Sequence, residues 1–154
     1  DPYRVFVYTT LQELATQYSH GATGRIVGEY EPGLGRILHE VAQDAARHFA
    51  FYRVQARMRL ARSVWARRQT RWAMDHLWAI VGTGVRPQSE TDFVVVHLFG
   101  DEEGGSAALD MDRTMAELPG MGGCTIFRRA RDHARGREDR IPARAPGMWT
   151  AVPA

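Results

Sequence analysis

The sequence predicts an all-α protein organised around two long helices. Residues 6–21 and residues 37–52 each repeat apolar side chains at steps of three and four, the spacing of an amphipathic helix. Between them lies a stretch rich in glycine and proline, residues 28–35, which is typical of a turn. We therefore expect an antiparallel helix hairpin as the first structural unit.

The two predicted helices carry polar side chains on their facing stripes. Glu13, Thr16 and His20 follow one another at i, i+3 and i+7 on the first. The second has a stripe of six residues: Ile37, Val41, Asp44, Ala45, His48 and Tyr52. Glu13 lies 15 residues before the turn and His48 lies 13 residues after it. At about 1.5 Å of rise per residue, these spans are roughly 22 and 20 Å, so the carboxylate and the imidazole should lie at one level. Such a pair inside a helix hairpin suggests a metal site.

The rest of the chain also predicts helices. We expect a third helix over residues 63–80, a turn over 82–91, a helix over 91–100 despite its β-branched residues, and a short amphipathic helix over 106–118. Ser89 and Asp92 resemble a helix-capping pair. Residues 128–154 are rich in Arg, Pro, Gly and Ala, which predicts a flexible tail after a domain of residues 1–127.

Length and composition narrow the class of protein. The 154 residues suit one domain, and no apolar run approaches the roughly 20 residues of a membrane span. The single cysteine, Cys124, excludes an internal disulfide and favours a reducing cytoplasm. A start at Asp1, without Met or a secretory signal, suggests a truncated chain.

The basic residues are all arginine, 20 in number, and seven of them crowd into residues 53–71 without an acidic residue. A solvated helix face would explain this run, and so would a docking surface for an acidic partner. Nucleic-acid binding is a third interpretation, but no helix-turn-helix, zinc or RNA-binding motif accompanies the arginines. Three tryptophans follow in or beside this run, and we expect Trp65, Trp72 and Trp78 either to pack in the core or to line an apolar channel.

The first helix resembles a known family. The motif FVYTTLQELATQYSHG of residues 6–21, followed by DAARHFAFYR of residues 44–53, is similar to the C-terminal half of the soluble acyl-[acyl-carrier-protein] desaturases, which are ferritin-like di-iron proteins. Residues 100–121 resemble the C-terminal region of that family more weakly. The resemblance implies a partial ferritin-like helical bundle.

The same resemblance implies a ligand set for two irons. A ferritin-like site takes a Glu from each of two helices and a Glu-x-x-His from each of two others. Glu13 matches one lone Glu and His48 matches the His of the second motif, but Ala45 stands where the family has a bridging Glu. No histidine of the chain has an acid three residues before it, so two of six ligands remain. Asp44 and His20 match positions that orient ligands, although Asp44 could also replace the missing Glu. A pair of buried polar groups without metal is the other interpretation of Glu13 and His48.

By resemblance, the parent activity is O₂-dependent insertion of a cis double bond into an acyl chain held on acyl carrier protein, with electrons from a ferredoxin. Thr16 matches a hydroxyl near the oxygen-binding side and could relay protons, or it could bond back to its own helix. The resemblance also implies a cytoplasmic homodimer, without membrane or nucleic-acid partners. It places carrier-protein docking on four arginines: Arg53, Arg57, Arg62 and Arg68.

With its ligands incomplete, we expect this chain to be impaired or inactive alone. A non-catalytic remnant that binds carrier protein or dimerises is the alternative function. An unrelated Arg-rich helical binding protein is the third.

Overall fold

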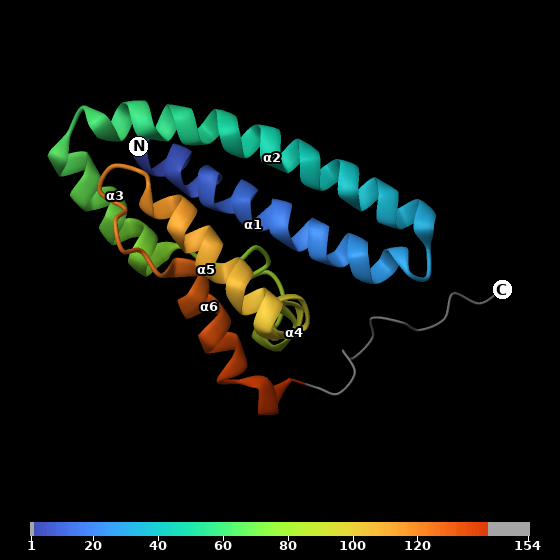
Figure 1. The fold of residues 1–154 in the computed structure, drawn as a ribbon. Coiled ribbons are helices and arrows are strands. Elements are labelled where there is room, and N and C mark those ends of the chain that lie inside the picture. The colour runs from blue at the N-terminus through green and yellow to red at the C-terminus, as the bar shows by residue number, and fades with distance from the viewer. Residues whose placement is uncertain (1, 142–154) are drawn as a thin grey trace.

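The computed structural model describes residues 2–141, and it confirms the all-α class (Figure 1). The elements are α1 (Pro2–Gly28), α2 (Pro32–Ala61), α3 (Val64–Leu77), α4 (Gln88–Phe99), α5 (Glu102–Ala116), α6 (Ile126–Arg135) and a 3₁₀ turn η1 (Glu138–Arg140). Within residues 2–141 the one β-type pairing is an isolated bridge between Thr83 and Arg86. The predicted helices over residues 63–80, 91–100 and 106–118 correspond to α3, α4 and α5.

The α1–α2 hairpin is longer and more tightly closed than the sequence predicts. The turn occupies residues 29–31 rather than 28–35, because α2 already begins at Pro32, a residue well suited to the first helical turn. Glycines allow α1 and α2 to approach each other closely beside this turn. A Cβ atom on Gly35 would lie 2.7 Å from the Cα atom of Gly28, so no larger residue fits at position 35 without a shift.

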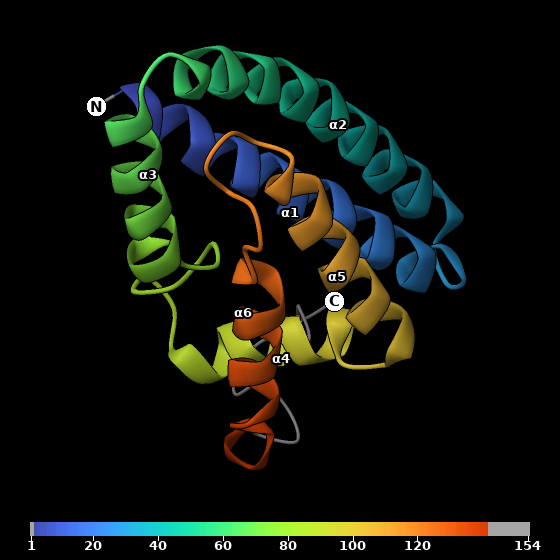
Figure 2. The same ribbon diagram turned by 60° about the vertical axis from the view of Figure 1, so that its left-hand side comes forward.

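Helix α1 lies at the centre of the fold, with α2 on one side and the other helices on the opposite side (Figures 1 and 2). Val7, Leu11 and Leu14 point from α1 into the main core. Helix α2 adds Ala56 and Leu60 near its C-terminal end, and α5 adds Ala108, Met111 and Met115. The core is therefore built between α1 and the C-terminal helices, while α2 covers one flank of α1.

The C-terminal helices are tied together by two buried carboxylates. Asp112 of α5 accepts hydrogen bonds from the backbone N–H groups of Phe127 and Arg128 and from Nε of Arg128, at 3.0, 3.3 and 2.9 Å. Asp92 of α4 is held by Arg137, with Nε 2.7 Å and Nη2 2.8 Å from its two carboxylate oxygens. The proposed Ser89–Asp92 cap is wrong, because Pro87 occupies the N-cap position of α4 and makes no side-chain cap there.

Helical structure also extends past the predicted boundary at residue 128. Residues 126–135 form α6, whose Phe127 and Ala134 are buried. The Arg-rich composition of this segment predicted a tail. Composition alone does not show that Phe127 and Ala134 are buried, nor that acidic residues on other helices pair with the arginines. Residues 142–154, the remainder of the predicted tail, lie outside the described residues.

Among residues 2–141, no helix is both long enough and apolar enough to cross a membrane.

Candidate functional site

The predicted pair of Glu13 and His48 meets across the hairpin. Oε2 of Glu13 on α1 lies 3.6 Å from Nδ1 of His48 on α2, as the helical levels required. The Glu13 side chain is 23% exposed, whereas that of His48 is 63% exposed. The pair therefore lies at the edge of the hairpin, with its imidazole turned to solvent, and is not a buried polar contact.

The residues around this pair bring no third metal donor. Ala45, one turn before His48, is buried and carries only a methyl group. Asp44 is exposed and forms an ion pair with Arg47 of its own helix. His20 directs Nδ1 toward the carbonyl oxygen of Thr16, 2.9 Å away. Within residues 2–141, no group of three His, Cys, Asp or Glu side chains is arranged to hold a metal ion.

A di-iron centre therefore does not fit residues 2–141 by themselves. Two irons bound by carboxylates and imidazoles need about six protein ligands, and the hairpin presents one carboxylate and one imidazole within reach of each other. The ligand roles of Glu13 and His48 stay predictions.

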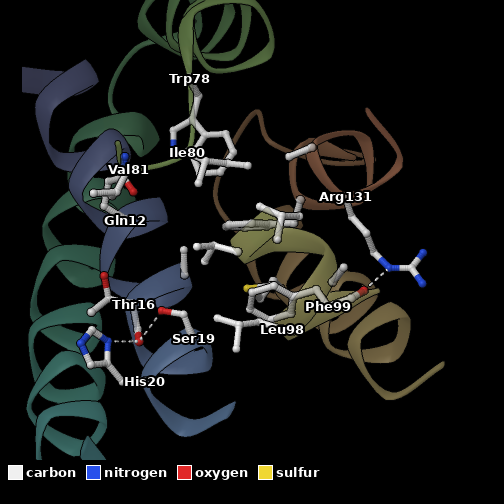
Figure 3. A pocket seen from close by; sticks show the side chains of 17 residues that line it. Gln12, Thr16, Ser19, His20, Trp78, Ile80, Val81, Leu98, Phe99 and Arg131 are labelled. Carbon is white, nitrogen blue, oxygen red and sulfur yellow. Dashed lines mark hydrogen bonds between the residues drawn. The ribbon is translucent and has the colours of Figure 1, made fainter. Parts of the chain in front are cut away.

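An apolar cavity of about 230 Å³ lies between α1 and the C-terminal helices, with Thr16 and His20 in its wall (Figure 3). Eight of its 17 lining residues are apolar side chains of α4, α5 and α6, among them Val95, Met111 and Phe127. Gln12, Thr16, Ser19 and His20 line it from α1. No hydrogen bond of the Thr16 hydroxyl is found among residues 2–141, so the back-bonded alternative for this side chain is not observed.

Two polar atoms beside this cavity are buried without a hydrogen-bond partner in the described structure. They are Nε1 of Trp78 and Oε1 of Gln12. Such atoms are costly to bury unless something binds them. The sequence pointed to Trp78 as one of several possible channel residues but gave no signal for its free N–H. Trp65 and Trp72 are exposed, so neither packs in the core nor lines this cavity.

The arginine run divides into two groups. Arg59 stacks on Phe6, Arg67 caps the carbonyls of Leu60 and Ala61, and Arg71 pairs with Asp75. Arg53 forms an ion pair with Glu117. In contrast, Arg57, Arg62 and Arg68 are exposed, and their side chains form no hydrogen bond or ion pair within residues 2–141. Three of the four predicted docking arginines are thus available to a partner.

The thiol of Cys124 does not belong to a reactive site. Its Sγ donates a hydrogen bond to the carbonyl oxygen of Asp112 at 3.3 Å, and burial raises its pKa to about 11. Little thiolate therefore forms at neutral pH, so Cys124 is an unreactive thiol.

Comparison with known proteins points to the same hairpin. Residues 1–65 match a family model described as fatty acid desaturase. Acyl-[acyl-carrier-protein] desaturase 3, chloroplastic, of Oryza sativa is 49% identical over 53 residues, which cover 34% of this chain and 13% of the relative. Stearoyl-[acyl-carrier-protein] 9-desaturase, chloroplastic, of Gossypium hirsutum is 48% identical over 52 residues, 33% of this chain and 13% of the relative.

The matched segments span only 13% of each of these relatives. The match to the family model ends where α3 begins, so the weaker resemblance of residues 100–121 lies outside it. No solved structure matches the chain. Residues 1–65, which include the α1–α2 hairpin, are therefore similar to the fatty acid desaturase family, and part of the chain is similar to plant acyl-[acyl-carrier-protein] desaturases.

Proposed function

We propose that this chain acts on acyl groups carried by acyl carrier protein. It is a desaturase-like protein that contributes one carboxylate and one imidazole, Glu13 and His48, to an iron site that it does not complete alone. The parent reaction is the O₂-dependent introduction of a cis double bond, with a ferredoxin as electron donor. The remaining ligands come from outside residues 2–141, and this chain by itself is inactive in desaturation.

The position of the apolar cavity carries this proposal. Thr16 and His20 line it, and they lie one and two turns from Glu13 along α1. An acyl chain in the cavity would pass beside the helix that carries Glu13, with apolar walls that favour methylene groups. The free N–H of Trp78 can donate to a carbonyl oxygen, such as that of an acyl thioester.

Delivery by carrier protein is supported by the unpaired arginines. Arg57, Arg62 and Arg68 crowd the end of α2 and the start of α3 without acidic neighbours that neutralise them. Acyl carrier proteins are acidic, so such a patch would steer their approach and lose its effect at high salt. We place the protein in the cytoplasm or an equivalent reducing compartment; the matched relatives are named as chloroplastic.

The test is binding of palmitoyl- and stearoyl-carrier protein to the purified chain, measured by calorimetry in a salt series. We expect salt-sensitive binding that weakens about tenfold or more in the triple variant Arg57→Glu, Arg62→Glu and Arg68→Glu. A matched triple variant at arginines on the C-terminal helices, Arg113→Glu, Arg135→Glu and Arg140→Glu, changes the total charge equally and should bind as the wild type does. Equal weakening in both variants, or no binding by the wild type, contradicts the proposal.

The cavity is tested with the same assay. Val94→Trp places a large ring at a cavity-lining position that is 47% exposed, so it should narrow the cavity without disturbing the core. Val85→Trp, at a position 87% exposed and away from the cavity, is the control. We expect only Val94→Trp to weaken binding of acylated relative to unacylated carrier protein.

A second candidate function is a non-catalytic remnant that binds carrier protein, and Ala45 favours it because no bridging carboxylate is present there. Fe²⁺ binding by equilibrium dialysis separates the two candidates. The iron-ligand proposal predicts weak Fe²⁺ binding that Glu13→Gln and His48→Ala both reduce. The remnant predicts that neither substitution changes Fe²⁺ binding.

A further inference from the structure

The outward side of helix α3 carries two tryptophans that the core does not use. Trp65 and Trp72 are 66% and 54% exposed, although tryptophan is a largely buried residue in most proteins. We call this side of the helix the α3 face; its exposed residues are Val64, Trp65, Arg68, Trp72 and His76. Figures 1 and 2 show α3 at an edge of the molecule, so this face is open to a partner.

The two tryptophans form a row along the helix. Seven residues are close to two helical turns, so Trp65 and Trp72 start about 10 Å apart along the axis and about 20° apart around it. Arg68 lies between them on the same side. The imidazole of His76 stacks on the Trp72 ring, with centroids 5.1 Å apart and planes at 18°, and its Nδ1 lies 2.8 Å from the Trp72 carbonyl oxygen. These contacts hold the Trp72 ring in its exposed position.

The surroundings of the α3 face are positively charged. Residues 45–74 contain no Asp or Glu. The next acid along the chain, Asp75, is engaged by Arg71 and Arg129 and so leaves no free negative charge beside the face. Three arginines in or next to the face form no ion pair within residues 2–141; they are Arg57, Arg62 and Arg68. The partner of this surface should therefore be anionic and should also accept indole rings.

We propose that the α3 face binds the surface of an anionic lipid bilayer, with its tryptophans among the headgroups and the arginines against lipid phosphates. An indole ring joins an apolar body to an N–H donor and favours this region. A guanidinium group matches phosphate through two parallel hydrogen bonds. Each basic residue near an anionic surface strengthens binding about fivefold, so three arginines would contribute about a hundredfold. Binding should therefore require anionic lipid.

Other partners fit the α3 face less well. Single-stranded nucleic acids stack on aromatic rings inside a charged groove, whereas this face is the convex side of a helix and includes the aliphatic Val64, which is 61% exposed. Docking of carrier protein accounts for the charge of the arginines but not for the two indole rings. The desaturase match ends at residue 65, so the expectation of no membrane partner, which came from that resemblance, does not cover most of α3.

Cosedimentation of the full chain with vesicles tests the proposal. At low salt, we expect the wild type to pellet with vesicles of equal parts phosphatidylcholine and phosphatidylglycerol, and to stay in solution with phosphatidylcholine alone. The double variant Trp65→Ser and Trp72→Ser should bind the anionic vesicles about tenfold more weakly or less. The matched control, Tyr30→Ser and Leu34→Ser, replaces side chains that are 83% and 43% exposed beside the α1–α2 turn, and it should bind as the wild type does. Circular dichroism should show equal helix content in both variants.

Three results overturn the proposal: a wild type that does not pellet with the anionic vesicles, equal pelleting with phosphatidylcholine alone, or a tryptophan variant that binds the vesicles as the wild type does. If the wild type binds an oligothymidylate and not the vesicles, the α3 face is a nucleic-acid surface instead.

The calorimetric assay with carrier protein keeps this proposal apart from the proposed function. Trp65→Ser and Trp72→Ser should leave the binding of carrier protein unchanged, because the arginines remain. Vesicle binding needs no acyl carrier protein, so its failure would not affect the proposed function. A tryptophan variant that loses carrier-protein binding, in a chain that does not bind vesicles, would assign the α3 face to carrier protein and overturn the membrane proposal.

Discussion

The N-terminal hairpin and the C-terminal helices of this protein treat their polar groups in opposite ways. In the C-terminal helices, Asp92 and Asp112 are buried, and each carboxylate is fully engaged by arginine or backbone donors. In the hairpin, Glu13 and His48 meet at an open edge, and Asp44 faces solvent. The desaturase match covers the hairpin and not the C-terminal helices. The region that matches the desaturase family is thus the one whose polar groups remain exposed, and we propose that these groups serve a partner or ligand rather than stability.

The largest effect should come from Asp112→Ala. Asp112 is 2% exposed and acts as the N-terminal cap of α6 from another helix, since Thr125 at the N-cap makes no side-chain cap. Removing it leaves the Phe127 N–H without its acceptor and Arg128 without its partner. We expect a loss of about 3 kcal/mol in unfolding free energy, measured by urea denaturation.

Asp110→Ala is the matched control on the same helix. Its ion pair with Arg113 is 3.6 Å long and both side chains are largely exposed. The change should stay within about 0.5 kcal/mol. Equal losses for the two variants would contradict a special role of the buried carboxylate.

A smaller effect is expected for Asp92→Asn, about 1–2 kcal/mol, because Arg137 is partly exposed and can be solvated when its partner is lost. The hydrogen bonds from Arg137 lower the pKa of Asp92 below its ordinary value. Since the folded state then holds the proton less tightly than the unfolded state, this stabilisation is complete above about pH 5 and is lost as the pH falls below about 4. Urea denaturation of the wild type and Asp92→Asn between about pH 3 and pH 7 should show that their difference in unfolding free energy becomes smaller as the pH falls. A difference that is independent of pH would contradict this explanation.

The smallest effects should come from the hairpin pair. His48 is mostly exposed, so His48→Ala and Glu13→Gln should each change the unfolding free energy by no more than about 0.5 kcal/mol, measured by the same denaturation at a protein concentration low enough to keep the chain monomeric. A loss as large as that of Asp112→Ala would show that the pair is a structural contact.

The facing of Glu13 and His48 and the presence of α3, α4 and α5 could be predicted, whereas the extent of α6 could not. Helical periodicity alone placed Glu13 opposite His48, because both helices are regular and the turn between them is short. The extent of α6 was missed because its stability comes from Asp112 and other distant residues, which local composition does not reveal. The cavity was also beyond the sequence, since five separate segments form its wall. Of the three tryptophans within residues 2–141, only Trp78 lines it, while Trp65 and Trp72 are exposed.

Hydrogen exchange with and without unacylated carrier protein tests the contrast between the two regions most directly. If the exposed arginines at the end of α2 bind carrier protein, the backbone amides of that end of α2 should exchange more slowly when the carrier protein is added at about 100 μM, whereas those of α5 and α6 should not change. Exchange in α2 that the carrier protein leaves unchanged would contradict this account.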